Sequence, residues 1–265
     1  MISLINILKE AVSQPKAIIL AGAPGAGKGY ILRGLDLGSI KILNVDDIYV
    51  PLLKKANVTL DLKNATPEER SEQAKQMAAA NKQFKGDVEA TIGGKESFIL
   101  DGTGASYNST VKLKNELEEA GYKVFMLYVY TDLERSLSQN QDRYEKSEGK
   151  DRSLAPAIVM RTWKSVTDNL PKYAELFGNN FVAVANTLDD RMQDIDKIIK
   201  KYLTPFTPQG TKPKTPKEQA KSDARKAKDK EEIQAMLSDD FIYDVIEYTM
   251  SKEEAQMRIG KFLNS

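Results

Sequence analysis

The stretch that decides the fold is Gly22-Ala23-Pro24-Gly25-Ala26-Gly27-Lys28. It follows an apolar run, 17–21, that is typical of a buried strand, and it precedes a predicted helix that begins near Tyr30. Glycines let a backbone curl so that several N–H groups point at one anion, and the new helix adds its positive end. A strand, this loop and a helix predict a phosphate-binding P-loop, in which Lys28 reaches the outer phosphates. A simple glycine-rich turn with a surface lysine is the alternative, and the flanking elements disfavour it.

The end of this loop departs from the common P-loop pattern. The usual sequence ends in lysine followed by serine or threonine, whose hydroxyl binds magnesium, but here Gly29 and then Tyr30 follow the lysine. The run resembles the loop of adenylate kinases, which have threonine where this chain has Tyr30. We therefore expect magnesium to be held through the nucleotide, water and carboxylates. The residues expected to bind the nucleotide are Gly22, Ala23, Pro24, Gly25, Ala26, Gly27, Lys28, Gly29 and Tyr30.

Composition restricts the chemistry that this chain can perform. With 265 residues it is long enough for one sizeable α/β domain and an appendage. It has no cysteine, which excludes disulfides and thiolate metal sites, and no histidine, so acid–base chemistry must use other groups. The formal net charge of +1 gives no reason to expect binding to nucleic acid or membranes. No apolar run could span a bilayer and no signal peptide is recognisable, so we expect a cytoplasmic protein.

Apolar strand patterns alternate with helical patterns along most of the chain. The expected strands are 17–21, 40–45, 97–100, 124–130 and 181–185. Thr66 and Glu69 predict a capping box at the start of a long helix to about Thr91, and Thr131 and Glu134 predict another. This alternation predicts an α/β fold of the P-loop NTPase type, a parallel sheet with helices on both faces. The carboxyl ends of the strands then share the edge at which such sheets bind ligands.

Three regions are expected. Residues 1–203 would form the P-loop domain, and residues 204–230 would be a linker, first proline-rich and then basic. Residues 231–265 carry two amphipathic stripes and predict a small helical hairpin, too small to hold a core alone. This hairpin could dock back onto the domain or onto another chain. The sequence interpretation favours a protein partner or a second copy.

Acidic residues follow the second and third expected strands. Asp46 and Asp47 end the second, and Asp101 ends the third, so each lies near the place where the loop would hold a terminal phosphate. One carboxylate could accept a proton from an attacking hydroxyl, and another could orient magnesium through water. The alternatives are a helix N-cap for the first pair and a turn aspartate for Asp101.

Arginines follow in the second half of the domain. Phosphoryl transfer needs cations on the transferred group, and the guanidinium fork suits phosphate oxygens. The polar segment 139–152 contains Gly149 and is typical of a mobile lid. A solvated charged surface is the alternative for any single arginine. The arginines concerned are Arg135, Arg143, Arg152 and Arg161.

These motifs together resemble the zeta-toxin-like P-loop kinases, a family with relatives common in phage genomes. The order is the P-loop, Asn-x-Asp-Asp at 44–47, Asp-Gly-Thr-Gly at 101–104, Thr-Asp-Leu-Glu-Arg at 131–135 and Arg-Ser-Leu at 152–154. The resemblance covers residues 15–186. A phage origin would place the protein in the host cytoplasm.

The resemblance implies transfer of the γ-phosphate of ATP to a hydroxyl of a small molecule, with Mg²⁺. The zeta toxins themselves use a nucleotide sugar. By the same resemblance Asp46 would be the base, with Asp47 one residue away, and Asp101 would match the acidic residue before Gly-Thr. Asp46 and Asp101 would face the metal through water. Arg143 and Arg152 would match the lid arginines, and Arg161 matches less well.

Other functions stay open at this point. A P-loop fold retained as an assembly or adaptor module would explain the missing loop hydroxyl and the tethered hairpin. A nucleoside monophosphate kinase rests on the loop alone. The combination of Lys28, Asp46, Asp101 and the arginines favours the kinase that acts on a small molecule or nucleotide sugar.

Overall fold

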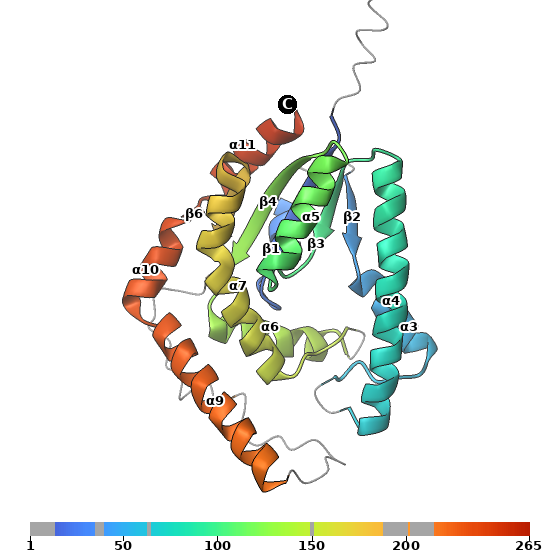
Figure 1. Ribbon diagram of the computed structural model, residues 1–265, viewed down its shortest axis with the longest axis vertical. Coiled ribbons are helices and arrows are strands. Elements are labelled where there is room, and N and C mark those ends of the chain that lie inside the picture. The colour runs from blue at the N-terminus through green and yellow to red at the C-terminus, as the bar shows by residue number, and fades with distance from the viewer. Residues whose placement is uncertain (1–13, 35–39, 63–64, 149–150, 188–200, 202–214) are drawn as a thin grey trace, which may run out of the picture.

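Six parallel strands form one sheet in the part of the chain that the structure describes (Figure 1). The computed structural model describes residues 14–34, 40–62, 65–148, 151–187, 201 and 215–265. The strand order is β2-β3-β1-β4-β5-β6. The strands are β1 (Lys16–Gly22), β2 (Lys41–Asn44), β3 (Phe98–Asp101), β4 (Lys123–Tyr130), β5 (Phe181–Ala185) and β6 (Thr249–Met250).

Burial explains why the apolar runs became the centre of this sheet. Every residue of β1 is buried, and so is all of β4 after its first residue. Such continuous apolar strands are typical of parallel sheets that are covered on both faces. β2 lies at an edge, where Ile42 remains 47% exposed. The predicted α/β fold with a parallel sheet is confirmed.

Helices cover both faces of the sheet (Figure 1). Apolar residues of α5 and α7 pack on one face, where α4 also contributes near the β2 side. α2 and α11 pack on the opposite face. The helices are α2 (Lys28–Gly34), α3 (Asp46–Lys55), α4 (Pro67–Gly93), α5 (Tyr107–Glu119), α6 (Leu133–Lys146), α7 (Pro156–Phe177), α9 (Pro216–Met236), α10 (Asp239–Glu247) and α11 (Lys252–Leu263), with a 3₁₀ turn at Gly178–Asn180. No helix among the described residues combines the length and the apolar character needed to cross a membrane.

The two predicted capping boxes had different outcomes. Thr66 caps α4, where its side chain accepts from the Glu69 amide and the Glu69 carboxylate accepts from the Thr66 amide. The second box is wrong, because α6 begins one residue later, with Asp132 as its N-cap. The Thr131 hydroxyl instead donates to the carbonyl of Asn186 (2.8 Å), which ties the end of β4 to the end of β5. A buried tertiary hydrogen bond has replaced the local one.

The expected linker is partly helical. Residues 216–230 belong to α9, which begins with a full capping box between Thr215 and Glu218 and with proline at its first position. These are strong helix-start signals, and the Ala, Lys, Glu and Gln content that follows has high helix propensity. The end of α9 is anchored by Ile233, Met236 and Leu237 in a cluster with Trp163 of α7. Residues 204–214, the proline-rich part, lie outside the described residues, and the predicted domain boundaries stay a prediction.

The C-terminal segment docks on its own domain. β6 pairs with β5 and extends the sheet, a strand that the sequence analysis missed. Ala255, Ile259 and Phe262 of α11 are buried on the sheet, where Phe262 meets Phe125 with ring centroids 4.8 Å apart. The favoured placement of residues 231–265, on a partner or a second copy, is therefore wrong for these buried faces. Covering the apolar face of the chain's own sheet is what the amphipathic stripe does.

We expect Phe262→Ala to lower the free energy of unfolding by about 3–4 kcal/mol, because it removes a buried ring from the sheet. Met257 provides the matched control, since it lies in the same helix and is 67% exposed. Met257→Ala should change stability by no more than about 0.5 kcal/mol. Urea denaturation measures both, and equal midpoints for the two variants would contradict the docked position of α11.

Candidate active site

The loop between β1 and α2 has a backbone that only glycine tolerates at two positions. Gly25 and Gly27 have φ of +76° and +80°. A Cβ on Gly25 would lie 2.3 Å from the carbonyl oxygen of Ser136, and one on Gly27 would lie 2.3 Å from Nδ2 of Asn186. The loop is therefore packed tightly against α6 and against the end of β5. Both the left-handed backbone and the close contacts require glycine here.

Three consecutive loop carbonyls are held by side chains from outside the loop. The Ser136 hydroxyl donates to the Pro24 carbonyl (2.5 Å), and Nδ2 of Asn186 donates to the Ala26 carbonyl (2.7 Å). In the orientation of its amide that satisfies both neighbours, Gln139 donates to the Gly25 carbonyl (2.8 Å) and accepts from Arg135 (2.8 Å). These contacts fix the orientation of the peptide planes. Because each carbonyl is held by a side chain from outside the loop, the N–H of the same peptide plane points in the opposite direction.

The amides of Gly27, Lys28 and Gly29 have no hydrogen-bond partner among the residues that the structure describes. Such successive unpaired amides form a concave site for an anion. The Ala26 and Tyr30 amides, in contrast, bond to the carbonyls of Ala23 (3.0 Å) and Gly27 (2.9 Å). The central part of the loop thus has the free amides that the predicted P-loop needs, and phosphate binding by these residues stays a prediction.

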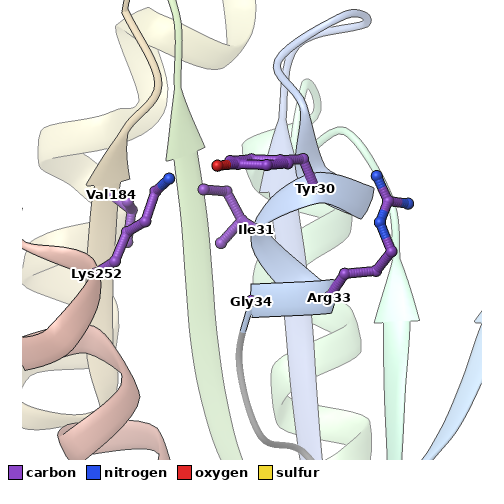
Figure 2. A pocket seen from close by; sticks show the side chains of 6 residues that line it. All are labelled: Tyr30, Ile31, Arg33, Gly34, Val184 and Lys252. Atoms are coloured by element: carbon purple, nitrogen blue, oxygen red, sulfur yellow. The ribbon is translucent and has the colours of Figure 1, made fainter.

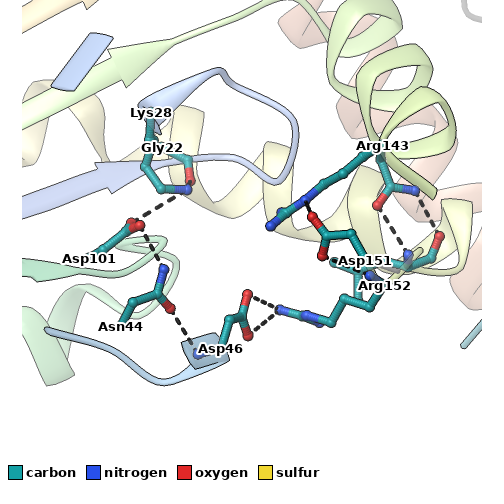
Figure 3. A network of polar contacts seen from close by, with 10 residues as sticks. Gly22, Lys28, Asn44, Asp46, Asp101, Arg143, Asp151 and Arg152 are labelled. Carbon is teal, nitrogen blue, oxygen red and sulfur yellow. Dashed lines mark hydrogen bonds and ion pairs between the residues drawn. The ribbon is translucent and has the colours of Figure 1, made fainter. Parts of the chain in front are cut away.

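Lys28 extends from the start of α2 toward the end of β3 (Figure 3). Its Nζ donates to the Gly22 carbonyl (3.1 Å) and lies 3.9 Å from Oδ1 of Asp101. Burial lowers the pKa of the Lys28 ammonium, and the nearby Asp101 carboxylate opposes part of that shift. Burial also raises the pKa of Asp101, against the effect of Lys28. Each group partly offsets the cost of burying the other.

A chain of polar contacts joins the two predicted acidic positions (Figure 3). Nδ2 of Asn44 donates to Oδ2 of Asp101 (2.9 Å), and Oδ1 of Asn44 accepts from the backbone amide of Asp46 (2.9 Å). The side chains come from the ends of β2 and β3 and from the start of α3. Asp46 therefore lies in the same network as Lys28, whereas Asp47 has an exposed side chain.

Arg152 completes this network. Its Nη2 contacts both carboxylate oxygens of Asp46 at 2.7 Å, and its guanidinium carbon lies 5.8 Å from the centre of the Tyr49 ring. The buried Nε of Arg152 has no hydrogen-bond partner among the described residues. Arg143 pairs with Asp151, whose other oxygen accepts from the Arg152 amide (2.8 Å). The structure thus brings both predicted lid arginines toward Asp46, Arg152 by direct contact and Arg143 through Asp151.

Arg161 and Arg135 do not contact the network of Lys28, Asp101 and Asp46. Nε of Arg161 is 3.9 Å from Asp229 of α9, so Arg161 faces α9 rather than the loop. Arg135 donates to the carbonyl of Thr187 (2.8 Å), beyond the end of β5. The described part of the expected lid is helical up to Lys146, and Gly149 lies outside the described residues.

Tyr30 directs its side chain away from the loop. The ring is 57% exposed, and Nζ of Lys252 from α11 lies 4.4 Å from its centre. A pocket of about 260 Å³ separates this side chain from β5 (Figure 2). Its lining consists of Tyr30, Ile31, Arg33, Gly34, Val184 and Lys252. The Tyr30 amide is bonded to the Gly27 carbonyl, and its ring lies against Lys252. A contact between Tyr30 and the nucleotide therefore stays a prediction.

The donor set fits a nucleotide better than a bare metal ion. The unpaired amides and Lys28 suit phosphate oxygens. Among the described residues, no three acidic side chains gather as a cation site would need. Gly29 also provides no hydroxyl for magnesium. A role for Asp46 and Asp101 toward magnesium, reached through water, stays a prediction.

Sequence reasoning missed several residues of the site. The Asn44 side chain joins the Asp101 carboxylate to the backbone amide of Asp46, a role that its place in the motif does not indicate. Asp151 positions both lid arginines. Ser136, Gln139 and Asn186 hold the loop carbonyls. A signal existed for Asn44, because the last residues of two adjacent parallel strands lie side by side.

The region that holds this site matches a known protein family. The family model described as zeta toxin matches residues 4–198 of the chain. The chain belongs to the zeta toxin family. The matched region contains the loop, both acids and both lid arginines, while α9, α10 and α11 lie beyond it. Comparison with curated proteins gave no match.

Solved structures share the fold. A protein of the PezAT chromosomal toxin–antitoxin system of Streptococcus pneumoniae aligns with a TM-score of 0.50 and 19% identity, over 82% of this chain and 86% of that one. A structure of the AvrRxo1-ORF1:AvrRxo1-ORF2 complex with sulphate ions aligns with a TM-score of 0.50 and 16% identity, over 94% of this chain and 81% of that one. At these identities the similarity concerns the fold.

The tight loop gives a test that does not depend on activity. We expect Gly27→Ala to destabilise the protein by about 1–3 kcal/mol, because φ is positive there and the new Cβ displaces Asn186. Gly29→Ala is the matched control, since its Cβ would lie 3.6 Å from Arg33, an ordinary contact, and its φ is not positive. Thermal denaturation that finds Gly27→Ala as stable as Gly29→Ala would contradict the loop geometry.

Proposed function

We propose that this zeta-toxin-family protein is an ATP-dependent kinase that transfers the γ-phosphate to a hydroxyl of a small molecule. One observation carries the proposal. Unpaired loop amides, Lys28, a pair of acids and Arg152 converge at the carboxyl end of a parallel sheet. Phosphoryl transfer needs this combination of anion-binding donors, cations and a nearby base.

In the proposed reaction, the acceptor hydroxyl attacks the γ-phosphorus of ATP and the bond from that phosphorus to the bridging oxygen of ADP breaks. The hydroxyl proton passes to a carboxylate, because the chain contains no histidine. Asp46 is the proposed base, since Asn44 and Asp101 connect it to Lys28. The side chain of Asp47, in contrast, is exposed. Lys28 and the loop amides would hold the β- and γ-phosphates.

Arg152 has to change partners during this reaction. In the structure Arg152 holds both carboxylate oxygens of Asp46, so this carboxylate is not free to contact an acceptor hydroxyl. A γ-phosphoryl group would attract Arg152 and give its unpaired Nε an acceptor. That exchange would release Asp46 when ATP is present. Arg143, which pairs with Asp151 nearby, would supply a second cation for the transferred group.

The proposed substrates follow the family. ATP is the donor, and a nucleotide sugar is the acceptor class that the resemblance suggests. Mg²⁺, when bound with ATP, would neutralise charge on the β- and γ-phosphates. Asp46 and Asp101 are the residues that would face it through water. The two structural relatives named above belong to a toxin–antitoxin system and to a two-protein complex, so a protein partner for this chain is a reasonable further proposal.

The adaptor alternative is less well supported. It rests on the absence of a loop hydroxyl and on a hairpin free to bind a partner. The hairpin's apolar stripe is buried on its own sheet, which removes the second reason. Gly29 alone does not favour the adaptor, since magnesium can be held through the nucleotide and water.

The test uses ATP and Mg²⁺, with a panel of nucleotide sugars as acceptors and water as the default acceptor. Lys28→Ala should weaken ATP binding or turnover by about 2–3 kcal/mol, because a charge-assisted contact is lost. Asp46→Asn should keep ATP affinity and reduce transfer about 100-fold. Asp47→Asn is the matched control and should have a much smaller effect. Equal transfer by wild type and Lys28→Ala would reject the kinase proposal, and the reverse ranking of the two Asp variants would move the base to Asp47.

The arginines can be tested in the same assay. Arg152→Ala and Arg143→Ala should lower kcat by at least about 10-fold and change ATP affinity less, because their contacts to the transferred group strengthen in the transition state. Arg161→Ala removes an arginine of the same domain that faces Asp229 instead. Its kcat should stay close to that of the wild type. If all three variants behave alike, the assignment of the lid arginines is wrong.

A further inference from the structure

Asn44 is the last residue of β2, and its side chain lies between two proposed site residues (Figure 3). The parallel register places Asn44 directly beside Asp101, and Nδ2 donates to that carboxylate at 2.9 Å. Oδ1 accepts from the Asp46 amide at 2.9 Å. The two neighbours agree on the orientation of the amide, because a carboxylate can only accept and a backbone N–H can only donate.

The contact to Asp46 is a local turn at the start of a helix. Oδ1 of Asn44 bonds the amide two residues later, which is an Asx turn. Asp46 is the first residue of α3, so its amide has no partner within the helix. Asn44 therefore satisfies an amide at this helix start and sets the point at which α3 leaves the sheet.

The contact to Asp101 is a link between strands. Lys28 lies 3.9 Å from Asp101, so Asn44 connects the lysine–aspartate pair to the backbone that carries Asp46. The charged groups that face Asp101 are Lys28, Asp46, Arg143 and Asp47. Asn44 is uncharged. It therefore links the Asp101 carboxylate to the backbone of Asp46 without adding a third negative charge to these two.

We propose that Asn44 is a positioning residue that fixes Asp46 relative to Asp101 and Lys28. The inference rests on the proposed function. The described contacts of Asp46 are Arg152 on its carboxylate and Asn44 on its amide. When Arg152 turns to the phosphate, Asn44 is the contact that keeps the base in line with the acceptor. A misplacement of about 1 Å can cost about 100-fold in rate, so this contact affects kcat rather than nucleotide affinity.

Three variants separate the two hydrogen bonds. Asn44→Ser keeps an oxygen that can accept from the Asp46 amide but is too short to reach Asp101. Asn44→Ala loses both contacts. Thr91→Ala is the matched control, because Thr91 is buried and its hydroxyl makes two hydrogen bonds, to the carbonyl of Asp87 (2.8 Å) and from Nζ of Lys41 (2.9 Å), at the opposite end of β2 from Asn44.

Two measurements are made on the full chain. The first is steady-state transfer with ATP and Mg²⁺, giving kcat and KM for ATP separately. The second is hydrogen exchange of the Asp46 backbone amide by NMR, which reports the turn whether or not the protein is an active kinase. Thermal denaturation of each variant records the purely structural cost.

We expect Asn44→Ala to lower kcat about 100-fold with KM for ATP within about 3-fold, and to speed exchange of the Asp46 amide. Asn44→Ser should keep the amide protected and lower kcat about 10-fold. Thr91→Ala should lose stability comparably and leave Asp46 exchange unchanged. If Asn44→Ala retains kcat within twofold of the wild type, Asn44 has only a structural role and the proposal is overturned.

Failure of the proposed function would look different. If wild type and Lys28→Ala both lack phosphoryl transfer, the kinase proposal fails, and the exchange measurement then decides the positioning role by itself. Unchanged protection of Asp46 in Asn44→Ala would overturn it, and faster exchange in Asn44→Ala alone would support it.

Discussion

The parallel pairing of β2, β3 and β1 is the constraint on which the site depends. Because these neighbours run in the same direction, the last residues of all three strands meet at one edge. Asn44, Asp101 and the loop before Lys28 become neighbours there, although more than 70 residues separate Lys28 from Asp101 in the sequence. An antiparallel β2 would send Asn44 and Asp46 to the opposite edge and leave Lys28 without the acids.

The loop and its surroundings show how far sequence reasoning extends. The glycine-rich loop between a strand and a helix, the parallel sheet and the capping box at Thr66 follow from local patterns, and the structure agrees with each. The role of Thr131 could not be found in this way, because a tertiary hydrogen bond to Asn186 won over the local cap. Nor could the partners of the loop carbonyls, which come from α6 and β5 and are distant in sequence.

The C-terminal segment shows the opposite limit. Its stripes correctly indicate a buried face, but an amphipathic pattern does not say which surface covers it. The decisive fact is geometric: β5 leaves one side free for another parallel strand, and β6 occupies it. Two residues of strand give almost no period-2 signal, so β6 could not be predicted from its sequence. Residues 216–230 look like a continuation of the proline-rich linker because prolines also precede Thr215, whereas Pro216 occupies the first turn of α9, where proline is tolerated.

The position of α11 also governs when the domain can finish folding during synthesis. α11 is the last helix, and it covers the same sheet face as α2, which follows the P-loop. A chain emerging from the ribosome therefore exposes the apolar surface of β1, β4 and β5 until α11 has also emerged. The nucleotide loop is translated before α6 and Asn186, which hold its carbonyls, and before α11, which covers the sheet face beside it. A prematurely terminated chain would consequently carry the complete set of site residues on an unfinished sheet.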